Sequence, residues 1–89
     1  MNSIYRRNPG VEVSAMKAET LLFDPATNKF CLLNETAAVV WEHLRQPATV
    51  GRLVDSVCET FDGAERSQVA MDVQGLLRRL DELALIIVE

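Results

Sequence analysis

The side chains that could perform catalysis or bind a metal are few and far apart in the sequence. His43 is the only histidine, and the two cysteines, Cys31 and Cys58, are 27 positions apart. No CxxC or HxxxH spacing is present, so the pattern does not indicate a zinc site. Both cysteines have apolar neighbours, which favours two reduced, buried thiols over a disulfide.

The motifs of common enzyme classes are also missing from the sequence. Nucleophilic catalysis needs a nucleophile, a base and a group that orients the base, but no residue three or four positions from His43 is a nucleophile. GxGxxG, GxxxxGKS/T and GxSxG are absent. Asp81 and Glu82 are adjacent carboxylates on a polar helix face. We therefore expect a non-catalytic protein that needs neither a metal nor a cofactor.

Charge is unevenly distributed along the chain, whose formal net charge is -4. Residues 1–34 contain four basic and three acidic groups, whereas residues 35–89 contain five basic and ten acidic groups. Nucleic-acid-binding domains normally have a basic footprint, so this balance argues against a nucleic-acid partner. The basic pair Arg78 and Arg79 stands out, and it serves either solubility or the binding of an acidic partner.

Length and composition predict one small folded domain. The chain has 89 residues, and 48% of them are hydrophobic. Arg6 and Arg7 are not followed by the apolar segment of a secretion signal, and the longest apolar run, Leu83 to Val88, is too short to span a membrane. We expect a cytoplasmic protein with a flexible segment at residues 1–10 and a domain at residues 11–89.

The first part of the domain has the pattern of β-strands. Three extended segments, residues 11–16, 20–23 and 29–33, are separated by a short link at Lys17-Ala18 and by the turn Asp24-Pro-Ala-Thr-Asn28. Pro25 fixes φ at the second turn position, and Asn28 tolerates a left-handed backbone. The pattern predicts a small antiparallel sheet of two or three strands.

The hydrophobic period then changes to that of α-helices. Asn34 and Thr49 are suitable N-caps for helices over residues 35–45 and 50–61, and Pro47 ends the first helix. A longer amphipathic helix follows over residues 69–84. The closing segment Leu85 to Val88 is either a short strand or a packed apolar tail. The fold class is α+β: a small winged helix-turn-helix-like domain with a three-stranded antiparallel sheet followed by a three-helix bundle.

Such a fold leaves a strand edge open beside a long helix. Unpaired backbone groups on that edge can accept another chain as an added strand, which indicates an interaction module. Phe30, Leu32 and the helix positions near Leu76 are placed to supply apolar contacts. The same edge could pair with a second copy, so a homodimer is a further prediction.

Three segments of the chain resemble the PqqD-like family. They are Phe30-Cys-Leu-Leu-Asn-Glu-Thr-Ala-Ala-Val-Val-Trp-Glu-His-Leu44, Thr49 to Phe61, and Asp72-Val73 with the leucines that follow up to Leu85-Ile86. The resemblance covers roughly residues 11–88. One departure is Ala84, where the family usually has glycine before the closing apolar residues, and it concerns the geometry of the last turn.

The resemblance implies a peptide-recognition element of ribosomally synthesised, modified peptides, with three strands and three helices. Relatives bind the leader of a precursor peptide as a strand added to the third strand, and present it to a radical-SAM enzyme in pyrroloquinoline quinone assembly or to a leader protease in lasso-peptide pathways. The implied peptide-binding residues fall on the third strand and the third helix: Lys29, Phe30, Cys31, Leu32, Leu33, Asp72, Gly75, Leu76 and Arg79. Asp72 could also cap or pair locally, while Asn34, Ala37 and Trp41 are assigned to cap and core.

Two alternatives to a leader-binding adaptor stay open from the sequence. One is a winged-helix DNA-binding regulator, against which the negative charge argues. The other is a small accessory subunit of an enzyme, without peptide specificity.

Overall fold

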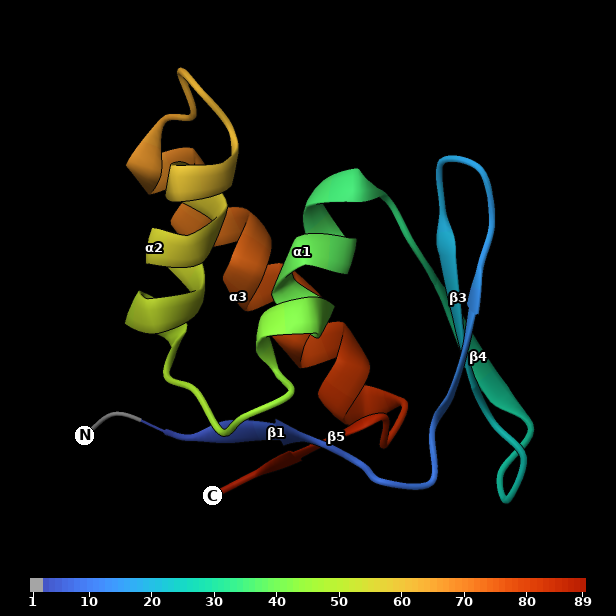
Figure 1. Ribbon diagram of the computed structural model, residues 1–89. Coiled ribbons are helices and arrows are strands. Elements are labelled where there is room, and N and C mark those ends of the chain that lie inside the picture. The colour runs from blue at the N-terminus through green and yellow to red at the C-terminus, as the bar shows by residue number, and fades with distance from the viewer. Residues whose placement is uncertain (1–2) are drawn as a thin grey trace.

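Two antiparallel sheets and three helices make up the computed structural model, which describes residues 3–89 (Figure 1). The elements in chain order are β1 (Tyr5–Arg7), β2 (Glu12–Ala15), β3 (Thr20–Asp24), β4 (Lys29–Leu33), α1 (Glu35–His43), α2 (Val50–Thr60), α3 (Arg66–Glu82) and β5 (Ile86–Val88). The prediction of an α+β fold with a three-stranded sheet followed by three helices is confirmed. Within the described residues, no helix combines the length and the apolar character needed to cross a membrane.

The three-stranded sheet has the order β2-β3-β4, with both pairs antiparallel. The turn between β3 and β4 forms as its sequence predicts. The Asp24 carboxylate accepts a hydrogen bond from the Ala26 N–H (3.0 Å), and the Asp24 carbonyl accepts one from the Asn28 N–H (2.8 Å). Asn28 has a φ of 60°, the left-handed conformation that this residue type tolerates.

Side-chain caps fix the starting points of the first two helices. The Asn34 side chain accepts a hydrogen bond from the Ala37 N–H (2.9 Å), and the Thr49 hydroxyl accepts one from the Arg52 N–H (3.3 Å). Helix α1 ends at His43, two residues before the predicted end. Helix α3 begins at Arg66, three residues earlier than the apolar pattern indicated, and Glu65 at its N-cap makes no side-chain capping bond.

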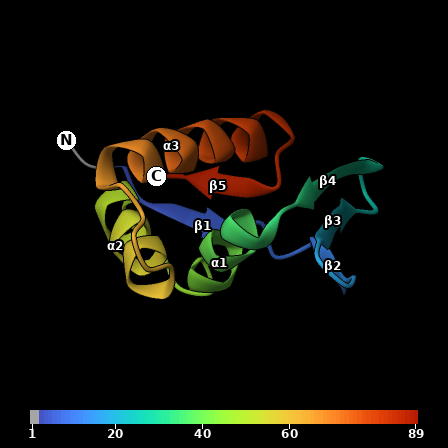
Figure 2. The same ribbon diagram turned by 90° about the horizontal axis from the view of Figure 1, so that it is seen from above.

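The core lies mainly among the three helices and the closing segment, and the inner face of the three-stranded sheet closes one side of it. The sheet contributes Leu22, Cys31 and Leu33, and the helices contribute mostly valine and leucine, with Trp41 from α1. Cys31 is buried as predicted, whereas Cys58 is only partly buried, and neither forms a disulfide. Figure 2 shows the three-stranded sheet at one end of the molecule, away from α2.

The N-terminal segment differs from expectation. Residues 1–10 were expected to be flexible, but Tyr5–Arg7 form β1 and pair with β5, with Tyr5 opposite Val88 and Arg7 opposite Ile86. Backbone bonds also join Tyr5 to Ala48 in both directions (2.8 and 2.9 Å). The segment therefore holds the closing strand and the α1–α2 loop in place. Met1 and Asn2 lie outside the described residues.

The last turn of α3 keeps its usual geometry despite the alanine at position 84. Ala84 has a φ of 57°, its N–H donates to the Asp81 carbonyl (3.0 Å), and the Leu85 N–H donates to the Leu80 carbonyl (2.9 Å). These two bonds define a Schellman motif, in which the left-handed residue is usually glycine. Alanine is thus forced into a conformation that its Cβ disfavours.

Candidate functional site

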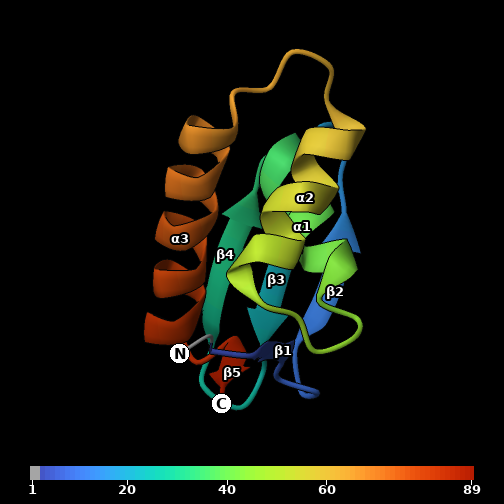
Figure 3. The same cartoon turned by 90° about the vertical axis from the view of Figure 1, so that its left-hand side faces the viewer.

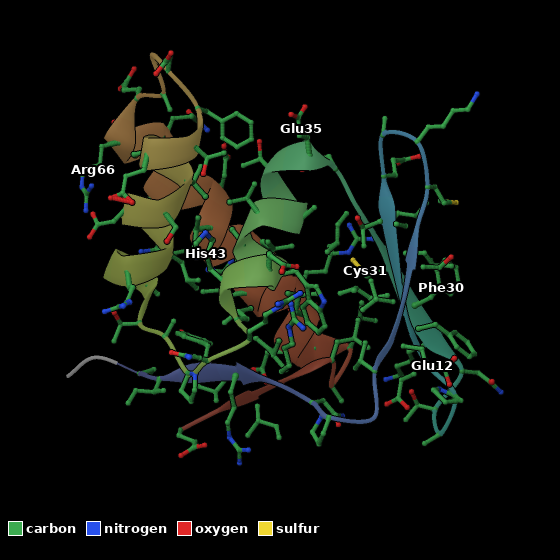
Figure 4. The ribbon with its side chains drawn as sticks, in the orientation of Figure 1. Glu12, Phe30, Cys31, Glu35, His43 and Arg66 are labelled. Carbon is green, nitrogen blue, oxygen red and sulfur yellow. The ribbon has the colours of Figure 1, made fainter. Side chains whose placement is uncertain are left out.

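Strand β4 forms one edge of the three-stranded sheet and carries apolar side chains on both faces. Cys31 and Leu33 point into the core, whereas Phe30 is 60% exposed and Leu32 is 48% exposed. Figure 4 shows Cys31 directed toward the helices and Phe30 on the opposite face of the sheet. Natural proteins usually protect such an edge with charges, prolines or a covering element, so an open apolar edge indicates a surface that receives a partner.

The pairing register shows which backbone groups of β4 are free. Hydrogen-bonded and non-hydrogen-bonded pairs alternate along an antiparallel ladder. The Met16 N–H bonds the Glu19 carbonyl (2.8 Å) where β2 turns into β3, and counting from there assigns the even-numbered residues of β3 to bonding with β4. Their partners on β4 are Lys29, Cys31 and Leu33. The N–H and C=O groups of Phe30 and Leu32 therefore point to the open edge.

A groove runs between this edge and helix α3. Its volume is about 520 Å³ and its floor is formed by α1. Figure 3 shows α3 beside β4, with the two elements running in opposite directions. The lining residues are Cys31, Leu32 and Asn34 from the strand side, Thr36, Ala37 and Val40 from α1, and Met71, Asp72, Val73, Gly75, Leu76 and Arg79 from α3.

Three other surface hollows of about 600–650 Å³ are lined by loops, turns and helix residues. None of these three includes a residue of the edge strands β2 and β4. His43 lines two of them and is not among the residues that line the β4 groove. In residues 3–89, no three His, Cys, Asp or Glu side chains are grouped to hold a metal ion.

The groove brings together residues from distant parts of the predicted site. Six of the nine residues implied by the family resemblance line it, namely Cys31, Leu32, Asp72, Gly75, Leu76 and Arg79. The other three lie elsewhere on β4: Lys29 is exposed at its start, Phe30 lies on the outer face, and Leu33 is fully buried in the core. Leu33 can therefore contribute through its place in the strand but not through side-chain contact.

Sequence reasoning missed several residues of the groove. Met71 is 68% exposed on α3 and lines the groove together with Thr36, Val40 and Val73. Asn34 caps α1 as predicted and also reaches the groove, as does Ala37. The signal for Met71 was its type: a large apolar residue on the polar side of an amphipathic helix stands out from its neighbours.

The charged residues of the groove have few partners within the protein. Asp72 accepts a hydrogen bond from the Gln68 amide (3.0 Å), which realises the local pairing that the sequence left open. Arg79 forms no ion pair with any residue between 3 and 89. By contrast, Arg66 at the start of α3 pairs with Asp55, and this hydrogen bond raises the pKa of Arg66.

Two solved structures have a similar fold. TbiB1 in complex with the TbiA(beta) leader peptide superposes with a TM-score of 0.78 at 21% identity, over 91% of this chain and 93% of that chain. Lasso peptide synthetase B1 complexed with the leader peptide gives a TM-score of 0.77 at 20% identity, over 93% and 96% of the two chains. A search of curated proteins gave no match.

The family comparison covers most of the molecule. The family model of coenzyme PQQ synthesis protein D (PqqD) matches residues 19–86. That range contains β3, β4, all three helices and every residue that lines the β4–α3 groove. The chain belongs to the PqqD family.

Proposed function

We propose that this protein is a non-catalytic adaptor that binds the leader of a ribosomally made precursor peptide as a strand added to β4. The observation that carries the proposal is the open edge of β4 facing a groove against α3. Membership of the PqqD family and the similarity to two proteins solved with leader peptides support it. The adaptor presents the bound leader to a modifying enzyme, such as a radical-SAM protein, or to a leader protease.

The energetics require both the edge and the groove. Phe30 and Leu32 offer four outward backbone groups, of which the Leu32 carbonyl already accepts a weak bond from the Cys31 thiol (3.8 Å). Four hydrogen bonds to a guest contribute about 2–6 kcal/mol at about 0.5–1.5 kcal/mol each. Micromolar affinity needs about 8 kcal/mol, and ordering the peptide subtracts from the gain. Burial of guest side chains against Leu76, Met71 and Leu32 must supply the remainder, which explains why an apolar groove accompanies the edge.

The other edge of the sheet is a natural control. Strand β2 is exposed along its whole length, and the same alternation leaves the N–H groups of Val13 and Ala15 free. Residues of β2 line none of the four hollows described above, although Met16, just past the end of β2, lines one of them together with α1. We expect a guest strand to choose β4 because only β4 combines free backbone groups with apolar side-chain contacts.

The test is a titration of the protein with a fluorescein-labelled leader from a precursor encoded beside its gene. Leu32→Pro removes one outward N–H without breaking the β3–β4 ladder, so we expect about three- to tenfold weaker binding. Phe30→Pro should act similarly. Val13→Pro makes the same change on the opposite edge and should leave affinity within about twofold of wild type. Circular dichroism checks that each variant is folded.

A second variant tests the groove without altering β4. Gly75 lies in the groove, and a Cβ added there meets no atom within 4 Å, so Gly75→Leu fits the fold and fills the guest's space. Gly51→Leu is the matched control, because Gly51 is also an exposed helical glycine with open space around it, on α2. Equal binding by both leucine variants, or no leader binding by wild type at about 100 μM, would overturn the proposal.

A further inference from the structure

Two opposite charges lie along the α3 wall of the groove. Asp72 and Arg79 are both exposed and both line it, whereas Arg78, the other member of the basic pair, does not. They are seven positions apart, or about 10 Å along the helix axis, and they share one helix face. Leu76 lies between them on that face. Along α3, the groove wall therefore presents an acidic side chain, then an apolar one, then a basic one.

Neither charge is neutralised by an opposite charge within residues 3–89. Asp72 is bound only by the uncharged Gln68 amide, and Arg79 has no ion pair among residues 3–89. A peptide that enters the groove brings its own charges within reach of both groups. The charge pattern is thus free to act on the partner.

The direction of α3 places these charges at defined ends of β4. Since α3 and β4 run in opposite directions (Figure 3), Asp72 lies toward the end of β4 and Arg79 toward its start. Lys29 adds a positive charge at the start of β4. Glu35, the first residue of α1, lines a separate hollow beside the β2–β3 turn and takes no part in this polarity. The groove is negative at one end and positive at the other.

The direction of a guest strand determines which of its ends lies beside the negative charge and which beside the positive charge. Antiparallel pairing continues the pattern of the sheet and is slightly more stable per residue than parallel pairing. Such a guest starts beside Leu33 and ends beside Lys29. Its side chains that face the groove recur every second residue, so positions i, i+2 and i+4 span about 13 Å. That span reaches from Asp72 past Leu76 to Arg79.

We propose that the groove selects its peptide by charge order: a basic side chain at i, an apolar one at i+2 and an acidic one at i+4. The inference rests on strand addition to β4, and it names the chemistry of the segment that is bound. The intervening positions i+1 and i+3 lie beside the exposed side chains of Leu32 and Phe30 and are apolar.

The test is a selection from an mRNA-display library of random 12-residue peptides on three proteins. Wild type should enrich basic–x–apolar–x–acidic sequences. The charge-swapped Asp72→Arg/Arg79→Glu protein should enrich the reverse order. Asp81→Arg/Arg78→Glu is the control, because it makes the same exchange on α3 at residues outside the groove, and it should enrich the wild-type order.

Two synthetic peptides of equal composition measure the size of the preference. One carries the enriched sequence, and in the other the basic and acidic residues have exchanged places. Exposed ion pairs change affinity by roughly 1.5- to 5-fold each, so the preferred order should bind about fivefold tighter, and 1 M NaCl should remove the preference. Enrichment of extended apolar peptides without charge order overturns the inference and leaves strand capture standing. No enrichment above a Leu32→Pro protein overturns strand capture itself.

Discussion

Arg7 joins the N-terminal strand to the first helix through its guanidinium group. Its Nε donates to the Trp41 carbonyl (3.0 Å), Nη2 donates to the same oxygen, and Cζ lies 4.6 Å from the centroid of the Trp41 ring. Burial lowers the pKa of Arg7, and the nearby Glu42 carboxylate offsets part of the decrease. The guanidinium group is positively charged at neutral pH. This charge interacts favourably with the partial negative charge at the C-terminal end of α1.

We predict that Arg7→Ala lowers the free energy of unfolding by about 1–3 kcal/mol, because it removes two charged hydrogen bonds and a cation–π contact. Arg7→Lys should restore only part of this, since an ammonium cannot stack or form the forked bond. Trp41, the single tryptophan, reports urea unfolding by fluorescence. Arg6→Ala is the control: Arg6 pairs with Glu89 on the surface and should matter by less than about 0.5 kcal/mol. Equal midpoints for the two alanine variants would contradict the prediction.

At the scale of elements, the end of α3 contains backbone strain that a single substitution can relieve. Ala84 occupies the left-handed position of the Schellman motif, where a Cβ costs about 1–2 kcal/mol. Ala84→Gly should therefore raise the free energy of unfolding by about 0.5–1 kcal/mol, after the larger chain entropy of glycine when unfolded is subtracted. The Tm should rise by about 2–8 °C.

The opposite substitution makes a control of opposite sign. Gly63, between α2 and α3, has a φ of 75° and open space around its Cα. Gly63→Ala introduces the same left-handed alanine and should lower the Tm by a similar amount, while Gly75→Ala, on a regular helix, should not lower it. A decrease in Tm for Ala84→Gly would show that alanine is favoured there by contacts outweighing its backbone strain.

The elements that could be predicted from sequence are those with local causes. The Asp24–Asn28 turn and the Asn34 and Thr49 caps depend on neighbours within four residues, and each formed as expected. Strand β1 did not follow from sequence, because three residues with two arginines show no apolar alternation and their partner, β5, lies about 80 positions away. The same distance effect hid Met71, whose place in the groove depends on how α3 docks beside β4.

At the scale of the whole molecule, one sheet joins the two ends of the chain and the other forms the groove. The β1–β5 pair ties the N-terminal segment to the closing strand, with further backbone bonds between Ile4 and Glu89 (3.0 and 2.8 Å). The three-stranded sheet and α3 form the groove, and no groove residue comes from β1 or β5. Stability and peptide capture should therefore be separable by mutation.

Deletion of residues 1–10 tests this separation. The deletion removes β1 and the Arg7 contact, leaving β5 and the buried Ile86 without their partner. We expect the free energy of unfolding to fall by about 2–4 kcal/mol and the Tm by roughly 10–25 °C. At about 10 °C we expect the truncated protein to remain folded, because its free energy of unfolding is still positive. It should then bind the labelled leader with an affinity within about threefold of wild type. Leu32→Pro should show the reverse pattern, with little change in Tm and about three- to tenfold weaker binding. No residue between 3 and 10 lines the groove. A truncated protein that keeps its circular dichroism spectrum but loses the leader would therefore contradict the separation and place part of the binding site on the N-terminal segment.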